Sequence, residues 1–379
     1  MKKIALLIAA ACLSMAAMAQ NPDEIIANLK SSIAPDGRTA IWDVKTIEQD
    51  GWLTVYGTVG TQQQADAVYQ ELTRHGLDCR QGLIVLEKSI PADQRWALVK
   101  LSIATLRCEP RHAAEIATQA IMGMPVKVVQ RANDEWMRVQ TPDGYIAYVP
   151  ESSLAYKTEA GMQDWRADTR YVVTVYDSRL VTEPKGDVTV TDLVLGNVLQ
   201  FKARKGKWLL LATPDGRQGY VEQSQVQELA QWAQQEFNPA LIEATARRMM
   251  GSSYLWGGTS TKVTDCSGLT KVSYLANAII LQRDASQQCL TGTVMSGDNW
   301  RQYEPMDLIF FGNSATGRVT HVGLYLGNGK FIHCSGQVKI NSLDPQDSTY
   351  LYSPLRASRI RGMVGTPGVT AVKDHPWYF

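Results

Sequence analysis

The sequence predicts a multidomain α+β protein, and three observations lead to this fold class. The chain has 379 residues, which is more than one ordinary hydrophobic core accommodates. A pattern of short strands near Trp136 is repeated near Trp208, which is typical of two tandem β domains. The last third places helical patterns before several strand patterns, and this order favours α+β over a doubly wound sheet.

The composition excludes several classes of protein. Lys and Arg number 38 and Asp and Glu number 37, so the chain is neither a broadly basic nucleic-acid binder nor a polyacidic protein. With 29 Gly, 15 Pro and 45% hydrophobic residues, it is not predicted to be disordered. We therefore expect a globular monomer that binds no nucleic acid.

Residues 1–19 have the layout of a cleaved secretory signal peptide. A basic start precedes an apolar run, and Ala17 and Ala19 place small residues at positions −3 and −1 of a cleavage site. The alternative is a lipoprotein cleavage box ending at Cys12, which would leave a very short apolar run. No other stretch of the sequence is long and apolar enough to predict a membrane span. We expect an exported, periplasmic protein without a stable membrane span.

Residues 20–92 are predicted to form a small α+β domain. Residues 23–29 and 63–75 have helical periodicity, and residues 52–59 alternate as in a strand. No pattern in this block points to a chemical activity.

The repeated segments predict two small β-barrels, at residues 93–158 and 159–230. Residues 136–149 align without a gap on residues 208–221, and both copies contain Thr-Pro-Asp-Gly. In this tetrapeptide Pro fixes φ and Gly takes a positive φ, which is typical of a tight turn between two strands. Each copy is therefore predicted to contain a hairpin, and the two units resemble bacterial SH3-like (SH3b) domains.

Loss of the signal peptide would leave five cysteines, an odd number. At least one thiol is then unpaired within the chain, unless it bonds to a partner. The sequence contains no Cys-x-x-Cys, and most of these cysteines are expected to be small buried apolar residues. The five are Cys79, Cys108, Cys266, Cys289 and Cys334.

Cys266 is the candidate nucleophile of the last block, residues 231–379. It follows Asp265 and precedes an apolar pattern that predicts a helix over residues 266–280. A thiol in the first helical turn faces unpaired N–H groups and the positive end of the helix dipole, and both favour the thiolate. Asp265 fits the N-cap of this helix.

Two histidines flank a predicted hairpin that turns at Asn328 and Gly329. They are His321 and His333, two of only five histidines in the chain. A nucleophilic cysteine needs a base, and the base needs a residue that orients it. A plain two-residue turn would place the two rings on opposite faces, whereas a bulge of one residue would return them to a common face. The sequence leaves this register open.

Several motifs occur in the order found in the NlpC/P60 cysteine peptidases, and residues 95–365 resemble this family. The motifs are Tyr254–Gly258, Asp265–Gly268, Arg283–Gln288, Pro305–Phe311 and the segment from His321 to His333. Met306 departs from the glycine that is common in the fourth motif, which puts that turn in doubt. Together with the signal peptide and the two SH3b domains, the arrangement resembles the YkfC-type γ-D-glutamyl-L-diamino acid endopeptidases.

The resemblance implies a papain-like α+β fold for the catalytic domain. It also implies hydrolysis of the bond between γ-D-Glu and a diamino acid, either diaminopimelate or Lys, in murein peptides. Cys266 would be the nucleophile, His321 the base and His333 the third polar residue. The backbone N–H of Cys266 would help to hold the oxyanion.

A substrate pocket that needs neither a cofactor nor a metal ion is also implied by the resemblance. The residues implied to line this pocket are Tyr254, Asp265, Ser267, Asp284 and Ser286 of the catalytic domain, and Glu109 and Tyr145 of the first SH3b domain. Arg217 occupies the place of Tyr145 in the second copy, so no pocket role is expected there.

Several functions compete. The favoured one is an exported endopeptidase of cell-wall peptide recycling, whose partners are murein peptides L-Ala-γ-D-Glu-diamino acid with a free N-terminal L-Ala. The runner-up of the same class remodels intact peptidoglycan. A non-catalytic SH3b wall-binding protein belongs to a different class. A metal hydrolase would use Cys266, His321, His333 and Cys334, but His333 and Cys334 are neighbours that alternate across a strand, which opposes a shared ion.

Overall fold

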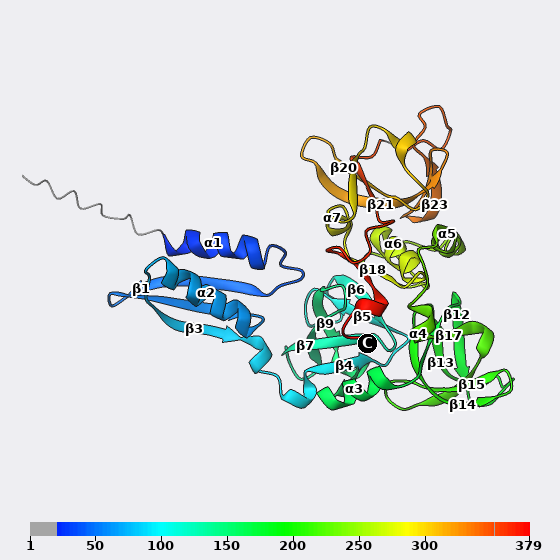
Figure 1. Ribbon diagram of the computed structural model, residues 1–379, viewed down its shortest axis with the longest axis horizontal. Helices are drawn as coiled ribbons and strands as arrows, with labels where there is room; N and C mark the ends of the chain where they lie inside the picture. The colour runs from blue at the N-terminus through cyan, green and yellow to red at the C-terminus, as the bar shows by residue number, and fades with distance from the viewer. Residues whose placement is uncertain (1–20, 352) are drawn as a thin grey trace, which may run out of the picture. The chain divides into compact units, whose positions relative to one another are not determined.

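The computed structural model describes residues 21–351 and 353–379, coloured along the chain in Figure 1. The predicted signal peptide at residues 1–19 lies outside this part. The chain divides into two compact units between Val85 and Leu86. The finer boundaries expected at residues 92, 158 and 230 stay predictions.

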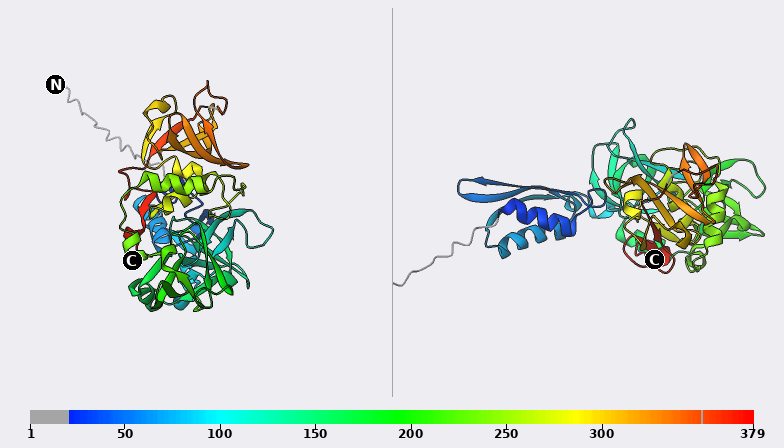
Figure 2. Two further views of the ribbon diagram at one scale, coloured as in Figure 1. Left: turned by 90° about the vertical axis from the view of Figure 1, so that its right-hand side faces the viewer. Right: turned by 90° about the horizontal axis from the view of Figure 1, so that it is seen from above.

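The first unit is a three-stranded sheet with two helices. Strand β2 pairs with β1 in an antiparallel hairpin and with β3 in parallel, so α2 is the crossover between β2 and β3. Both helices lie on one face of the sheet (Figure 2), where the two central residues Val55 and Val68 are fully buried. The elements are α1 (Pro22–Ile33), β1 (Trp42–Gln49), β2 (Trp52–Val59), α2 (Gln62–Arg74) and β3 (Cys79–Val85). The expected strand and both expected helices are confirmed.

The second unit begins with two seven-stranded antiparallel sheets, one for each predicted SH3b domain. The strands of the first are β4 (Trp96–Val99), β5 (Ile103–Arg107), β6 (Ile116–Ile121), β7 (Pro125–Arg131), β8 (Trp136–Gln140), β9 (Ile146–Pro150) and β10 (Leu154–Lys157). The strands of the second are β11 (Arg170–Val173), β12 (Asp177–Val181), β13 (Thr189–Val194), β14 (Val198–Lys205), β15 (Trp208–Ala212), β16 (Gln218–Glu222) and β17 (Val226–Glu228). Between them lies α3 (Glu159–Ala167).

The two sheets have the same topology. The strand order is β10-β4-β7-β8-β9-β5-β6 in the first and, in the corresponding direction, β17-β11-β14-β15-β16-β12-β13 in the second. The SH3-like fold and the duplication are thus confirmed. Among the described residues neither order returns to its first strand, so each sheet is open and the expected closed barrels are not formed by backbone hydrogen bonds.

The repeated Thr-Pro-Asp-Gly segments form the same turn in both copies. The amide of Thr141 donates to the carbonyl of Tyr145 at 2.9 Å, and the amide of Thr213 donates to the carbonyl of Arg217 at 2.9 Å. In each copy the Thr hydroxyl also donates to the Asp carboxylate of its turn at 2.5 Å. The predicted hairpins β8–β9 and β15–β16 follow directly, because each turn closes its own backbone hydrogen bonds.

The last region, residues 231–379, places helices beside a six-stranded antiparallel sheet of order β19-β24-β20-β21-β22-β23. Its helices are α5 (Pro239–Arg248), α6 (Cys266–Leu275) and α7 (Ala285–Gln288), after the short α4 (Leu229–Trp232). Its strands are β18 (Ile279–Leu281), β19 (Thr293–Ser296), β20 (Leu308–Asn313), β21 (Arg318–Gly327), β22 (Lys330–Ser335), β23 (Gln337–Ser342), β24 (Arg356–Arg359) and β25 (Val369–Ala371). Helix α6 is buried on almost every side, because it packs against α5, β18, β21 and β22.

Met306 keeps the turn that a glycine would make. Its φ is +73°, in the left-handed region that residues with a Cβ rarely adopt. Its amide donates to the carbonyl of Tyr325 at 2.7 Å, and its carbonyl accepts from the hydroxyl of Tyr274 at 2.7 Å. These bonds and the complete burial of its side chain hold the residue in place, so the substitution leaves the start of β20 intact.

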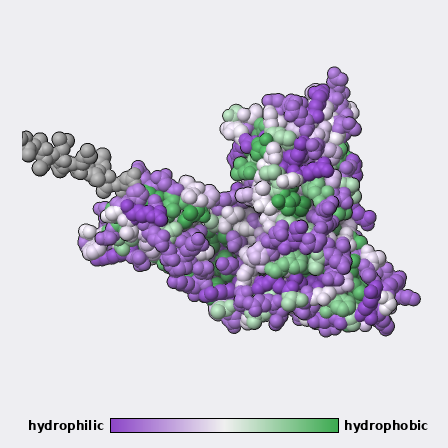
Figure 3. Space-filling model, in the orientation of Figure 1, coloured by the Kyte–Doolittle hydropathy of each residue, from purple (hydrophilic) through white to green (hydrophobic). Residues whose placement is uncertain are grey.

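Hydrophilic side chains predominate on the face drawn in Figure 3, and hydrophobic ones form separate patches there. Of the helices in the described part of the chain, none is both long and apolar enough to cross a membrane.

Candidate active site

The candidate nucleophile lies at the first residue of α6, as predicted. Asp265 is the N-cap, and its Oδ1 accepts from the amide of Gly268 at 2.7 Å. Its Oδ2 accepts from the amide of Gly257 at 3.0 Å, which ties the preceding glycine-rich loop to the helix start. Cys266 is only 7% exposed. The sequence folds this way because an Asp at the N-cap satisfies amides that the helix leaves unpaired.

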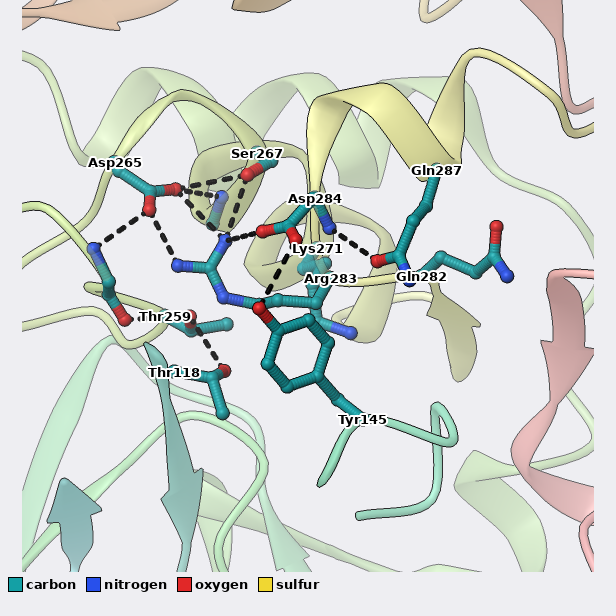
Figure 4. Close-up of polar contacts among 12 residues, drawn as sticks. Thr118, Tyr145, Thr259, Asp265, Ser267, Lys271, Gln282, Arg283, Asp284 and Gln287 are labelled. Carbon is teal, nitrogen blue, oxygen red and sulfur yellow. Dashed lines mark hydrogen bonds and ion pairs between the residues drawn. The ribbon is translucent and has the colours of Figure 1, made fainter. Parts of the chain in front are cut away.

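A buried arginine, for which no sequence pattern predicted a role, completes this cap. Arg283 donates to Asp265 Oδ2 at 2.5 Å and to Ser267 Oγ at 2.8 Å (Figure 4). Ser267 in turn donates to Asp265 Oδ1 at 3.2 Å. Asp265 and Ser267, expected to line the substrate pocket, are therefore engaged in a buried network that fixes the helix start. Removing one partner of such a buried ion pair costs about 3–5 kcal/mol.

The hairpin that carries the two histidines contains the bulge, and this defines the register that the sequence left open. Gly323 pairs with His333, and the register shifts between Tyr325 and Gly327. Because side chains alternate along a strand, His321 shares the face of Gly323 and hence of His333. His321 Nε2 lies 2.7 Å from His333 Nδ1. The bulge thus brings the two rings together.

The hydrogen bonds beyond His333 define the tautomer of both rings. Asn341 Nδ2 donates to the carbonyl of Thr349 at 2.8 Å, so its Oδ1 is the atom 2.9 Å from His333 Nε2. An oxygen acceptor there requires a proton on His333 Nε2 and leaves His333 Nδ1 as the acceptor. His321 Nε2 must then donate to it, and His321 Nδ1 keeps a free lone pair. A neutral imidazole in this tautomer can take a proton from a thiol.

Asn341, on β23, was missed by the sequence analysis. It stands opposite Phe331 on the neighbouring strand and outside the matched motifs. Only the pairing of β22 with β23 brings it beside His333, so no local pattern pointed to it.

The charges at the site differ from the sequence expectation of a thiolate. A hydrogen bond from the backbone of Val322, next to His321, favours the charged form of Cys266, and α6 packs against β21, the strand that carries His321. Burial and the nearby Asp265 carboxylate raise the pKa of Cys266 to about 11. Burial and the His333 ring lower the pKa of His321 to about 3. Burial thus opposes the expected preference for thiolate and outweighs the helix terminus, which favours a neutral thiol and a neutral imidazole at pH 7.

This neutral pair predicts the pH dependence of thiol alkylation. Below a pKa of about 11 the thiolate fraction rises roughly tenfold for each pH unit, so inactivation by iodoacetamide should accelerate steadily from about pH 6 to pH 10. The measurement is the rate of activity loss at each pH. Mass analysis of Cys266→Ala protein gives the background from the exposed Cys108. A rate that is constant from about pH 6 to pH 9 would instead reveal a preformed thiolate–imidazolium pair.

Two further predicted pocket residues lie at this site. Tyr254 is half-buried, and its pKa is raised by burial and by the proximity of Cys266 and Asp265. Asp284 is the N-cap of α7, and its Oδ2 accepts from the hydroxyl of Tyr145 at 3.2 Å. The structure thus brings Tyr145 of the first SH3b domain to the catalytic domain (Figure 4). Ser286 follows Asp284 on α7 and is half-buried, and its pocket role stays a prediction.

Glu109 is exposed and is engaged locally. It accepts from Arg111 Nε at 3.0 Å, and this hydrogen bond and charge lower its pKa. Burial and the nearby charges of Glu115, Asp284 and Glu109 raise the pKa of the adjacent Cys108. Cys108 therefore lies within reach of an acidic region formed by these three carboxylates, with Arg111 as a competitor for the carboxylate of Glu109.

The structure also shows where the potential metal ligands lie. Within residues 21–351 and 353–379 no group of three or more His, Cys, Asp and Glu is placed to hold a metal ion. Cys334 Sγ donates to the carbonyl of Thr264 at 3.4 Å and packs in the core, whereas the adjacent His333 contacts His321. The five cysteines of the described chain are free thiols.

A cysteine at the start of a helix, packed against the strand whose histidine is oriented by a second polar ring, is the arrangement typical of a cysteine hydrolase. Comparison with known proteins gives the same class. Residues 251–357 match the NlpC/P60 family, and residues 106–154 match the bacterial dipeptidyl-peptidase SH3 domain. The chain is a cysteine peptidase with an NlpC/P60 catalytic domain and a bacterial SH3 domain before it.

Two curated proteins are similar to this chain over most of their own length. Dipeptidyl-peptidase 6 of Lysinibacillus sphaericus is 28% identical over 265 residues, which cover 67% of this chain and 94% of that protein. The γ-D-glutamyl-L-lysine dipeptidyl-peptidase of Bacillus subtilis is 28% identical over 231 residues, which cover 58% of this chain and 72% of that protein.

Two solved structures show the same fold. An NlpC/P60 family protein from Bacillus cereus superposes with a TM-score of 0.62 at 21% identity, covering 70% of this chain and 99% of that one. An NlpC/P60 endopeptidase from Photobacterium damselae subsp. piscicida gives a TM-score of 0.55 at 18% identity, covering 76% of this chain and 75% of that one. The predicted α+β class with an NlpC/P60 domain is thereby confirmed.

Proposed function

We propose that the protein hydrolyses the γ-D-Glu–L-diamino acid bond of short murein peptides that carry a free N-terminal L-Ala. It would do so as an exported, periplasmic enzyme of cell-wall peptide recycling. The observation that carries the proposal is the contact of Tyr145, from the first SH3b domain, with Asp284 beside the Cys266–His321–His333 site. A domain at that position restricts access to the site and so favours substrates with a short free end. The relatives are named dipeptidyl-peptidases, and these names support a substrate with a short free end.

The chemistry follows from the tautomers. Cys266 Sγ attacks the γ-carbonyl carbon of D-Glu while its proton passes to His321 Nδ1, and the carbonyl oxygen becomes an oxyanion near the amides at the start of α6. Collapse of this adduct breaks the C–N bond, and His321 returns the proton to the departing amine. Water, deprotonated by His321, then attacks the thioester carbon; the C–S bond breaks, the peptide leaves with a γ-carboxyl group, and His321 returns the proton to the Cys266 thiolate. His333 accepts from His321 Nε2 throughout and stabilises the transient imidazolium.

Product analysis tests this proposal. The free tripeptide L-Ala-γ-D-Glu-diamino acid, with diaminopimelate or Lys, should release L-Ala-γ-D-Glu, whereas intact sacculi should release little, because their L-Ala nitrogen is acylated. Cys266→Ala protein is the blank. Preferential cleavage of sacculi would favour remodelling of intact peptidoglycan instead, and an absence of products from both would favour a wall-binding protein.

The acidic region predicts selectivity for the free amine. Glu109→Gln should lower kcat/KM for the tripeptide about three- to tenfold, a modest effect because the carboxylate is exposed and Arg111 competes for it. The comparison substrate is propionyl-γ-D-Glu-diamino acid, which lacks only the amine, and its kcat/KM should not change. An equal loss for both substrates would exclude an interaction of Glu109 with the amine.

A further inference from the structure

A buried ion pair joins the first SH3b domain to the catalytic helix. Lys271 on α6 donates to Asp143 Oδ2 at 2.6 Å, and the two side chains are only 13% and 6% exposed. Lys271 also donates to the carbonyl of Leu281. Asp143 belongs to the Thr-Pro-Asp-Gly turn that precedes Tyr145. The pair thus links α6, five residues after the nucleophile, to the turn that presents Tyr145.

Lys271 is not needed to form this turn, as the second copy demonstrates. There Asp215 accepts from Arg217 Nε at 2.9 Å, within its own turn, and the backbone closes in the same way. Both Asp side chains accept from the Thr hydroxyl of their turn at 2.5 Å. The local structure is therefore encoded by the repeat itself, and the buried lysine adds attachment to the catalytic domain.

Three contacts attach the first turn to the catalytic region. Besides Lys271 with Asp143, His375 Nε2 donates to the carbonyl of Pro142 at 2.9 Å, and Tyr145 donates to Asp284 Oδ2 at 3.2 Å. The three bonds come from consecutive parts of one turn and end on three separate segments of the catalytic region. Of these three contacts, the ion pair between Lys271 and Asp143 has a full charge on both partners, and the low exposure of both side chains shields it from solvent.

We propose that Lys271 and Asp143 form a positioning pair that sets substrate selectivity. By holding the turn against α6, they keep Tyr145 at Asp284 and make the first SH3b domain one wall of the substrate site. Neither side chain needs to touch the substrate, so both act through Tyr145. The inference rests on the proposed function for the chemistry at that wall, the free amine of L-Ala.

The first test replaces Lys271 by Met, which keeps a long apolar stem and removes the charge. Lys271→Met should raise KM for the free-amine tripeptide about 10- to 100-fold and change kcat less than about threefold, because the reacting groups stay in place. Both kcat and KM for propionyl-γ-D-Glu-diamino acid should change less than threefold. A variant that is only partly folded would lose kcat for both substrates in parallel, so the split between KM and kcat distinguishes positioning from stability.

A second variant tests whether the two residues act as a pair. Lys271→Met leaves Asp143 buried and unpaired, whereas adding Asp143→Asn removes that charge and keeps an acceptor for the Thr141 hydroxyl. The double variant should therefore recover at least about threefold in KM relative to Lys271→Met. If the Lys271→Met variant does not fold, the single variant Asp143→Asn tests the pair instead. Asp215→Asn, the same change in the second copy, is the matched control and should leave KM unchanged.

Hydrogen exchange reads the attachment without any substrate. In Lys271→Met protein, amides of residues 141–145 should exchange faster than in wild type, while residues 213–217 keep their rate. This result would stand even if wild-type protein failed to cleave the tripeptide, which would overturn the proposed function alone. Unchanged exchange at residues 141–145, or equal changes in KM for both substrates, would overturn the positioning pair.

Discussion

Replacement of Cys266 by Ala is expected to lower kcat for the tripeptide by about 10⁴-fold or more, because no other group in the site can form the thioester. The thermal transition should shift by only a few degrees, since removal of one sulfur at a helix start leaves a small void. Activity is measured by product release and stability by thermal melting of the same preparation.

The chain offers a matched control for this variant. Cys289 is a second buried cysteine of the catalytic domain, at the C-terminal end of α7. Cys289→Ala should shift the melting temperature by a similar amount and leave kcat within about twofold. Residual activity of Cys266→Ala within tenfold of wild type would rule out the cysteine mechanism. Cys266→Ser should keep at most a trace, because a hydroxyl is a weaker nucleophile at neutral pH.

The second large effect concerns the relay of histidines. His321→Ala should lower kcat by about 10³- to 10⁴-fold, because the proton acceptor is lost. His333→Ala should cost about 10- to 100-fold, because His321 remains but its tautomer and orientation are no longer fixed. His333→Asn should be milder than His333→Ala, since its Oδ1 can replace Nδ1 as the acceptor for His321.

Asn341 extends this series. Asn341→Leu removes the acceptor that holds the proton on His333 Nε2, so His333 can take the opposite tautomer and donate toward His321. We expect a loss of a fewfold to tenfold in kcat with little change in KM. A greater loss in kcat for His333→Ala than for His321→Ala would show that the two histidines have exchanged roles.

The sequence predicted the elements of the site better than their environment. The helix start at Cys266, the hairpin between His321 and His333 and the duplicated turn all follow from local patterns, because caps, turns and alternation are properties of neighbouring residues. The hairpin bulge depended on strand register, which two histidines alone do not determine.

What escaped prediction depends on contacts between distant segments. Arg283 meets Asp265 from beyond α6 and β18, and Lys271 meets Asp143 of another domain. The effect of burial on the thiol pKa escaped prediction for the same reason, since the degree of burial at Cys266 is set by the whole domain. Sequence motifs identify chemical groups, whereas their charge state follows from what packs around them.

The duplicated turn has a consequence for how such a protein can evolve. Its backbone bonds and its Thr–Asp bond are complete without the side chain that follows the glycine, which is Tyr145 in one copy and Arg217 in the other. A mutation at that position can therefore create or abolish a contact with a neighbouring domain at little risk to folding. Duplication of such a module supplies a spare copy of a position whose side chain is free to diverge. In this chain one copy now contacts Asp284 through its tyrosine, while the arginine of the other donates to the carbonyl of Lys100.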